Sequence, residues 1–153
     1  MKKLNVAVVG ATGMVGRTFL KVLEEENLPV ENYYLFASAR SAGSKVQFMG
    51  KEYTIEELTE SSFDRGIDIA LFSAGGSISE KFAPIAASKG CVVVDNSSAW
   101  RNDPTLPLVV PEVNPNDIRG YGIIANPNCS TIQSIIPLKA LDDKYGLTRV
   151  VYT

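Results

Sequence analysis

The chain has 153 residues, with 15 basic and 17 acidic side chains and no histidine, which gives a net charge of −2. Its length suits one domain, and its apolar fraction of 45% and charged fraction of 21% exclude a disordered or fibrous protein. The sequence contains no polybasic run, so nothing in it indicates a nucleic-acid or membrane-surface partner. The apolar segment before Gly10 is too short for an export signal or a membrane span, so we expect a cytoplasmic protein.

The first half of the chain alternates short apolar runs with one amphipathic segment. The patterns predict a strand at 6–9, a helix at 14–26, a strand at 33–37, a hairpin within 45–55 around Gly50 and Lys51, and a strand at 67–72. On the helix, the apolar stripe that should face the core consists of Val15, Phe19, Val22 and Leu23.

The second half continues the alternation. The patterns predict a helix at 79–89, a strand at 91–95, a proline-rich loop at 101–117 with an extended piece at 108–110, a strand at 122–125, a helix at 132–145 kinked at Pro137, and the start of a strand at 150–152. Strands that alternate with helices predict an α/β fold, a Rossmann-like doubly wound sheet with mostly parallel strands.

The domain organisation follows from this alternation. We predict a dinucleotide-binding domain over residues 1–148 that also carries a nucleophilic cysteine. Because the chain stops on an extended apolar segment, we expect a fragment in which residues 149–153 begin a second, α+β substrate and dimerisation domain.

A glycine-rich turn, GATGMVG at residues 10–16, follows the first predicted strand and opens the first helix. Gly10 allows the tight turn, Gly13 lets the backbone approach a pyrophosphate, and Gly16 lets the helix pack close to the sheet. The free amides of the helix N-terminus favour a bound phosphate. The spacing is one residue longer than the usual GxGxxG, and a glycine turn without a ligand is the alternative.

The end of the second strand selects the cofactor. An acidic residue there would bind the ribose of NAD, but this strand runs into Arg40 and Ser41 with no acid nearby, which favours the 2′-phosphate of NADP. A solvated loop arginine is the alternative. After the next strand, Ser73 and Gly75 either let the backbone approach the cofactor or form only a tight turn.

The two cysteines differ in their surroundings. They are too few for a disulfide framework and lack the spacing of a zinc site, so we expect reduced thiols and no metal. Cys91 lies in an apolar strand and should be buried. Cys129 lies between a strand and a helix, where the helix N-terminus favours its thiolate and free amides could hold an oxyanion. We therefore place Cys129, with Asn128 beside it, in the catalytic set.

Six segments together resemble the aspartate-β-semialdehyde dehydrogenase family along the whole chain. They are GATGMVG at 10–16, ASARSAG at 37–43, DIALFSAGG at 68–76, VVVDNSSAWR at 92–101, PLVVPEVNP at 107–115 and NPNCSTIQ at 126–133. The resemblance implies NADP-dependent reductive dephosphorylation of aspartyl 4-phosphate to aspartate 4-semialdehyde through a cysteine thioester, a step of lysine, threonine and methionine synthesis.

The resemblance also implies a role for individual residues. It assigns the nucleophile to Cys129 and phosphate binding to Arg101. It assigns cofactor binding to Thr12, Gly13, Met14 and Val15, and the 2′-phosphate contact to Arg40 and Ser41. The family further needs a histidine acid–base, a glutamine and a substrate-binding arginine, which we expect outside this chain; alone, the chain should be inactive.

The remaining alternatives belong to different classes. One is another acyl-phosphate reductase, such as an N-acetylglutamyl-phosphate reductase. Another is a non-catalytic NADP-binding module, for which Cys129 would be dispensable. We expect the intact enzyme to act on a small molecule as a homodimer or tetramer, without nucleic-acid or membrane partners.

Overall fold

The computed structural model describes residues 3–118, 120 and 122–153. Met1 and Lys2, at the start of the predicted domain, lie outside the described residues, as do Arg119 and Tyr121. The main sheet is built from strands β1 (Leu4–Val9), β2 (Val30–Ala37), β5 (Glu56–Glu57), β6 (Ile69–Phe72), β7 (Val92–Asp95) and β8 (Gly122–Ala125). Their order is β5-β2-β1-β6-β7-β8 and each described pairing is parallel, which confirms the predicted Rossmann-like sheet.

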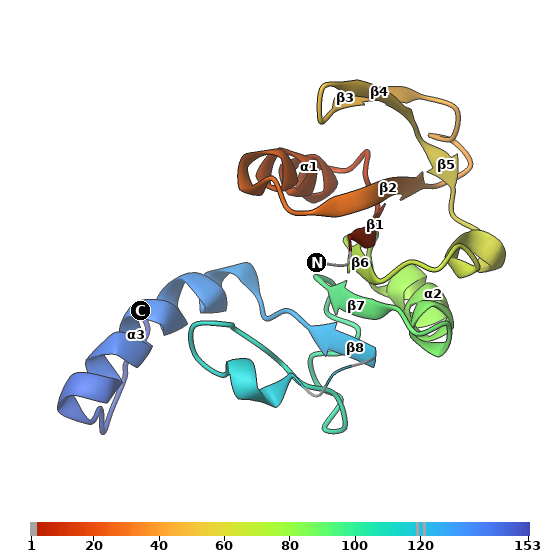
Figure 1. The fold of residues 1–153 in the computed structure, drawn as a ribbon. Helices are drawn as coiled ribbons and strands as arrows, with labels where there is room; N and C mark the ends of the chain where they lie inside the picture. The colour runs from red at the N-terminus through yellow and green to blue at the C-terminus, as the bar shows by residue number, and fades with distance from the viewer. Residues whose placement is uncertain (1–2, 119, 121) are drawn as a thin grey trace.

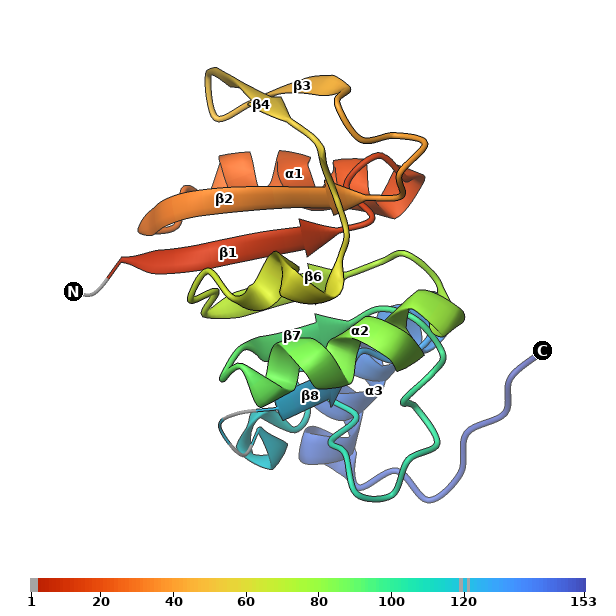
Figure 2. The ribbon, with the colours of Figure 1, turned by 90° about the vertical axis from the view of Figure 1, so that its right-hand side faces the viewer.

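Helices cover both faces of this sheet. They are α1 (Met14–Glu26), α2 (Gly76–Ser88) and α3 (Cys129–Tyr145), with short 3₁₀ helices η1 (Glu60–Phe63) and η2 (Pro115–Asp117). Figures 1 and 2 show α1 on one face and α2 on the other, whereas α3 leaves β8 on the side of α1 and projects away from the sheet. The antiparallel hairpin of β3 (Lys45–Phe48) and β4 (Lys51–Thr54) lies above α1 and β2 in Figure 1. None of the described helices is both long and apolar enough to cross a membrane.

The core explains why β1 is an uninterrupted apolar run. Residues 6–9 are all buried, because helices cover both faces of the strand. On the α1 side, Leu20 and Leu23 pack with Phe48 of the hairpin. On the α2 side, Phe63, Phe72 and Phe82 form a second cluster. Full burial of a large apolar side chain contributes roughly 1.5–3 kcal/mol to the free energy of folding. These clusters therefore stabilise the strands whose carboxyl ends carry the site.

The predicted inward stripe of α1 was wrong in two positions. Val15 and Val22 are 39% and 45% exposed, and the buried residues are Gly16, Leu20 and Leu23. The reason is the close approach of the helix at Gly16, where a Cβ atom would lie 2.1 Å from the carbonyl oxygen of Gly10. A glycine contact, rather than apolar spacing alone, sets which side of the helix faces the sheet.

Several predicted boundaries also shift. The hairpin turn is Met49-Gly50, both with positive φ (52° and 70°), and Lys51 already belongs to β4, because a two-residue turn of this kind needs two such residues. Strand β2 begins three residues earlier than predicted, at Val30, and α2 begins at Gly76 instead of residue 79. Gly75, at φ 91°, is the N-cap of α2.

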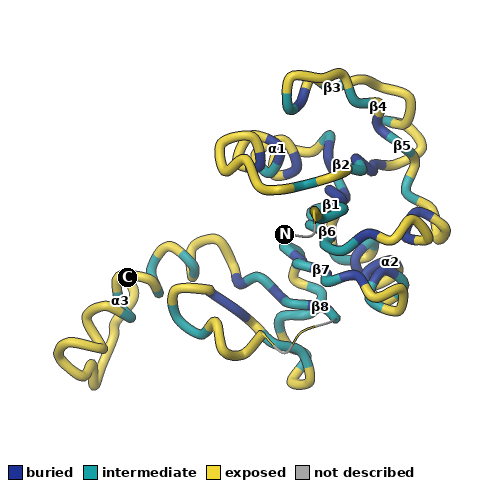
Figure 3. The backbone as a smooth tube through the Cα atoms, in the orientation of Figure 1, coloured by how far each residue is buried: buried dark blue, intermediate teal, exposed yellow. Residues whose placement is uncertain are grey.

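The last part of the chain departs most from the predictions. Helix α3 begins at Cys129, three residues earlier than predicted, because Asn128 caps it, and it continues through Pro137. None of its residues is buried, and Figure 3 shows α3 in the colours of exposed and intermediate residues. The predicted strand at 150–152 was wrong: residues 146–153 have no regular secondary structure, since a strand forms only against a neighbouring strand.

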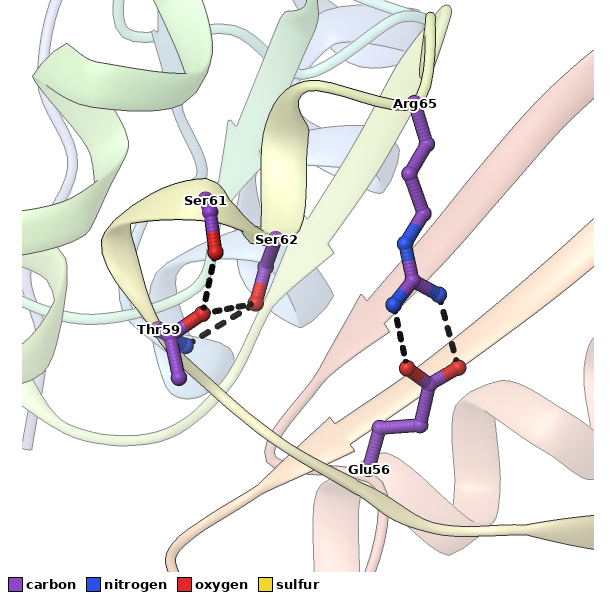
Figure 4. A network of polar contacts seen from close by, with 5 residues as sticks. All are labelled: Glu56, Thr59, Ser61, Ser62 and Arg65. Atoms are coloured by element: carbon purple, nitrogen blue, oxygen red, sulfur yellow. Dashed lines mark hydrogen bonds and ion pairs between the residues drawn. The ribbon is translucent and has the colours of Figure 1, made fainter.

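Polar contacts fix the segment that joins β5 to β6 (Figure 4). Arg65 donates to both carboxylate oxygens of Glu56, at 2.8 and 2.6 Å, and this contact raises the pKa of the guanidinium. Thr59 starts η1 and donates its backbone N–H to Ser62 Oγ at 2.9 Å. The amide of Leu58 donates to the carbonyl of Ala37. These contacts hold Leu58 beside the end of β2, where it lines the cleft described below.

Candidate functional site

A cleft of about 330 Å³ opens at the carboxyl ends of β1 and β6. This is the place where the strand order reverses, and doubly wound sheets bind ligands there. The lining residues come from the ends of β1, β2 and β6, the glycine turn, the segment after β5, and α2: Val9, Gly10, Thr12, Gly13, Ala37, Ser38, Leu58, Ser73, Ala74, Ile78 and Phe82. None of these lining residues is acidic, and Thr12, Ser38 and Ser73 contribute hydroxyl groups.

The glycine turn fits tightly between two strand ends. Gly10 has a φ of 89°, and a Cβ atom there would lie 2.5 Å from the carbonyl oxygen of Ser73. A Cβ atom at Gly13 would lie 3.3 Å from the carbonyl oxygen of Gly10. Gly10 and Gly16 are therefore required by the packing of backbone on backbone, and Gly13 keeps the turn free of a side chain where it faces the cleft.

The N-terminus of α1 has no side-chain cap. Gly13 is its N-cap, and the first turn contains no acidic residue. The side chains of Met14 and Val15 do not line the cleft, and Met14 is 87% exposed. What these two residues can offer a ligand is their backbone N–H groups, which lack intrahelical partners in the first turn. An uncapped helix N-terminus beside a glycine turn fits a phosphate group.

Arg40 and Ser41 lie in the turn that follows β2. Ser41 donates its N–H to the Ser38 carbonyl at 2.9 Å, and Arg40 is exposed and its side chain forms no hydrogen bond or ion pair with the described residues. Neither residue lines the cleft, whereas Ser38 does. Ser38 was missed as a site residue, although its position directly after β2 was the available signal. The 2′-phosphate contact of Arg40 and Ser41 stays a prediction.

Ser73 and Gly75 take different places after β6. Ser73 lines the cleft, and its N–H continues the sheet by donating to the carbonyl of Val9 at 2.9 Å. Gly75 does not line the cleft and serves as the N-cap of α2. This turn was expected either to let the backbone approach a cofactor or to be only a tight turn. The position of Ser73 agrees with the first interpretation, and that of Gly75 agrees with the second.

The two thiols lie in opposite environments. Cys129 is exposed as the first residue of α3, and Asn128 Oδ1 accepts the N–H of Ser130 at 2.9 Å. Cys91 is fully buried, as predicted. Burial, with a smaller contribution from the nearby Asp68 carboxylate, raises the pKa of the Cys91 thiol to about 12. Since the thiolate is the nucleophile, Cys91 is unreactive near neutral pH and Cys129 is the accessible thiol.

Arg101 lies at the same edge of the sheet as Cys129. Its Nε donates to the carbonyl of Asn126 at 2.9 Å, and its Nη2 donates to the carbonyl of Asn96 at 3.0 Å. Asn126 begins the turn that leads to Cys129, so the guanidinium is hydrogen-bonded to that turn. Asn96 was not among the predicted site residues, although it directly follows a buried strand, as Asn126 does.

Comparisons with known proteins agree with this arrangement. Residues 5–121 match the family model described as semialdehyde dehydrogenase, NAD binding domain. The chain is 62% identical over 150 residues to the aspartate-semialdehyde dehydrogenase of Aquifex aeolicus (strain VF5), covering 96% of this chain and 44% of that protein. It is 53% identical over 149 residues to that of Bacillus subtilis (strain 168), covering 97% and 43%. The chain thus spans less than half the length of these relatives.

Solved structures give the same result. The aspartate semialdehyde dehydrogenase II of Vibrio cholerae, complexed with ASA, has a TM-score of 0.90 at 50% identity, covering 95% of this chain and 48% of that one. The Candida albicans aspartate semialdehyde dehydrogenase with NADP has a TM-score of 0.80 at 27% identity, covering 94% and 48%.

Proposed function

This chain belongs to the semialdehyde dehydrogenase family, and from that membership we propose that the protein reduces L-aspartyl 4-phosphate to L-aspartate 4-semialdehyde with NADP as cofactor. The relatives confirm the resemblance to aspartate-semialdehyde dehydrogenases that the sequence segments carry. The observation that carries the proposal is the exposed Cys129 thiol at the first turn of α3, on the sheet edge that also holds the nucleotide cleft.

The cofactor site is proposed at the cleft between β1 and β6. The uncapped first turn of α1 and the glycine turn would bind the pyrophosphate through backbone N–H groups. Thr12 and Ser38 offer hydroxyl groups in the cleft, and Arg40 and Ser41 lie in the next turn, where a 2′-phosphate would be recognised. When bound, NADPH would supply the hydride that reduces the thioester to the aldehyde, with release of the Cys129 thiolate and formation of NADP+.

The acyl transfer is proposed for the turn at the start of α3. The Cys129 thiolate attacks the carbonyl carbon of the acyl phosphate, a C–S bond forms, the C–O bond to phosphate breaks, and phosphate leaves. Backbone N–H groups in the first turn of α3 would stabilise the oxyanion of the tetrahedral intermediate. The N–H of Ser130 is not among them, because it donates to Asn128 Oδ1. Arg101 would bind the departing phosphate through its planar fork of donors.

The acid–base groups must come from elsewhere in the protein. The 153 residues contain no histidine, and the curated relatives are about twice as long as the matched segment. We propose that an acid–base histidine, a glutamine and an arginine for the substrate carboxylate lie outside these residues. On this proposal the chain alone binds nucleotide but does not turn over substrate.

The test is an assay of the full-length protein with two acyl phosphates. Aspartyl phosphate should support NADPH oxidation and release one phosphate per NADPH consumed, whereas N-acetylglutamyl phosphate should not. A preference for N-acetylglutamyl phosphate would favour the other reductase. NADPH binding without turnover of either compound would favour the non-catalytic module.

A further inference from the structure

The guanidinium of Arg101 is held along one edge by two backbone carbonyls. Its Nε and Nη2 donate to the carbonyls of Asn126 and Asn96, at 2.9 and 3.0 Å. A guanidinium has five N–H groups, so these two bonds leave three for another partner. The carbonyls cannot be exchanged by substitution, but their spacing can change if the two strand ends that carry them move apart.

An amide–amide hydrogen bond ties these two strand ends together. Asn126 Nδ2 donates to Asn96 Oδ1 at 2.7 Å. The backbone continues the parallel ladder beside it, since Asn126 N–H donates to the Asp95 carbonyl at 2.8 Å and Asn96 N–H to the Phe72 carbonyl at 2.9 Å. The side-chain bond therefore lies one step beyond the last ladder bonds, next to the carbonyls that hold Arg101.

The loop that delivers Arg101 is anchored independently. Ser97 Oγ donates to the buried Asp95 carboxylate at 2.6 Å and accepts the N–H of Ala99 at 3.1 Å. Trp100 Nε1 donates to the buried Ser79 Oγ of α2 at 2.8 Å. Because the backbone before Arg101 is fixed by these bonds, loss of the amide–amide bond should alter the orientation of the guanidinium more than the position of the loop.

We propose that Asn96 and Asn126 are positioning residues for Arg101, which orient its three remaining N–H groups toward an oxyanion at the Cys129 turn. The inference rests on the proposed function, in which that oxyanion is the phosphate of the substrate. A pre-oriented donor group binds a charged ligand without the entropic cost of ordering a long side chain. Removing the amide–amide bond should therefore weaken phosphate binding while Arg101 itself is retained.

The experiment uses the full-length enzyme in the reverse direction, where inorganic phosphate is a substrate. Asn96→Ala, Asn126→Ala and the double variant form a cycle. The net free energy of one hydrogen bond corresponds to a change of roughly three- to tenfold in binding affinity. Each single variant should raise the KM for phosphate by that factor, and the double variant should raise it no further, because all three lack the same bond. The KM for NADP should stay within about twofold.

Two further variants guard against misfolding and general damage. Asn96→Asp keeps an oxygen acceptor for the Asn126 amide, whereas Asn96→Leu has a similar size and no acceptor. A phosphate KM that rises more for Asn96→Leu than for Asn96→Asp reports the hydrogen bond. The matched control is Asn32→Ala, which removes another amide–amide bond (3.0 Å to Asn5) where β1 and β2 run side by side and should leave the phosphate KM unchanged.

The outcomes separate this inference from the proposed function. An unchanged phosphate KM in both single alanine variants, or a parallel rise of the KM for NADP, would overturn it. If Arg101→Ala raises the phosphate KM and the asparagine variants do not, only the positioning role fails. If Arg101→Ala has no effect on the phosphate KM, the proposed role of Arg101 fails and the inference fails with it.

Discussion

The first turns of α1 and α3 use a helix N-terminus in different ways. At α1, Gly13 is the N-cap, no side chain caps the helix, and the helix is packed on the sheet through Gly16. At α3, Asn128 caps the helix through the N–H of Ser130, Cys129 is the first residue, and no residue of the helix is buried. The α1 turn therefore leaves its backbone N–H groups free for an anion, whereas the α3 turn presents the side chain of Cys129.

This difference implies different sensitivities to substitution. The α1 turn depends on backbone packing, because added Cβ atoms at Gly10 and Gly16 would lie within 2.5 Å of carbonyl oxygens. The α3 turn depends on side-chain chemistry, because its function is assigned to the Cys129 thiol and to the attached Arg101. Substitutions in α1 should therefore act on folding and nucleotide affinity, and those in α3 on turnover.

The largest expected effect is that of Cys129→Ser. In the full-length enzyme, turnover should fall by at least about a thousandfold, because a serine hydroxyl stays protonated without a base to activate it. The control is Cys91→Ser, which should lower the melting temperature but retain most of the turnover. Substantial activity in Cys129→Ser would remove the nucleophile from the proposed mechanism.

Cofactor selection should respond to Arg40→Ala. A charge-assisted contact with the 2′-phosphate corresponds to roughly ten- to hundredfold in affinity, so NADPH binding should weaken by that factor and NADH binding should not change. Fluorescence titration of both nucleotides measures this, with Lys51→Ala, an exposed cation of β4, as the matched control. Equal affinity of the parent protein for NADPH and NADH would contradict the assignment of Arg40.

Gly16→Ala tests the packing of the α1 turn. The added methyl group would lie 2.1 Å from the Gly10 carbonyl oxygen, and overpacking of this kind costs about 1–3 kcal/mol. The free energy of unfolding from denaturant titration should fall by that amount. Gly76→Ala is the matched control, since a Cβ atom at this first residue of α2 meets nothing within 4 Å. Equal stability of the two variants would show that the close approach is not required.

The smallest expected effect concerns the cap of α3. Asn128→Ala removes the acceptor for the Ser130 N–H and should lower stability by about 1 kcal/mol, whereas Asn128→Asp keeps a capping oxygen and should retain it. Thermal unfolding of both variants checks this. A loss of stability in Asn128→Asp equal to that in Asn128→Ala would exclude capping as the role of the side chain.

Local sequence patterns predicted five of the six strands of the main sheet, because each of these depends on nearby residues, but not the two-residue strand β5. The run at 6–9 is apolar throughout because it is buried on both faces, and Gly13 and Gly16 lie where the turn and helix packing require them. The predicted strand at 150–152 failed because β-branched composition favours a strand only when a partner is available. The roles assigned to Cys129, Arg40 and Arg101 remain predictions.

The contacts around Arg101 could not be read from the sequence. Asn96, Arg101 and Asn126 come from two strand ends and one loop, and only the pairing of β7 with β8 brings them together. No local spacing encodes this contact. The partial failure of the α1 stripe has a similar cause, since the approach at Gly16 depends on the position of Gly10 in the folded turn.

The most direct test of the account is the alkylation of the two thiols in the full-length enzyme between pH 7 and 9. The Cys91 thiol is buried, and its pKa of about 12 keeps it protonated over this pH range, so the reagent should modify Cys129 first. Mass mapping of the labelled peptide should show residual activity falling in proportion to the label on Cys129. Inactivation that instead follows the label on Cys91 would contradict the assignment of the nucleophile.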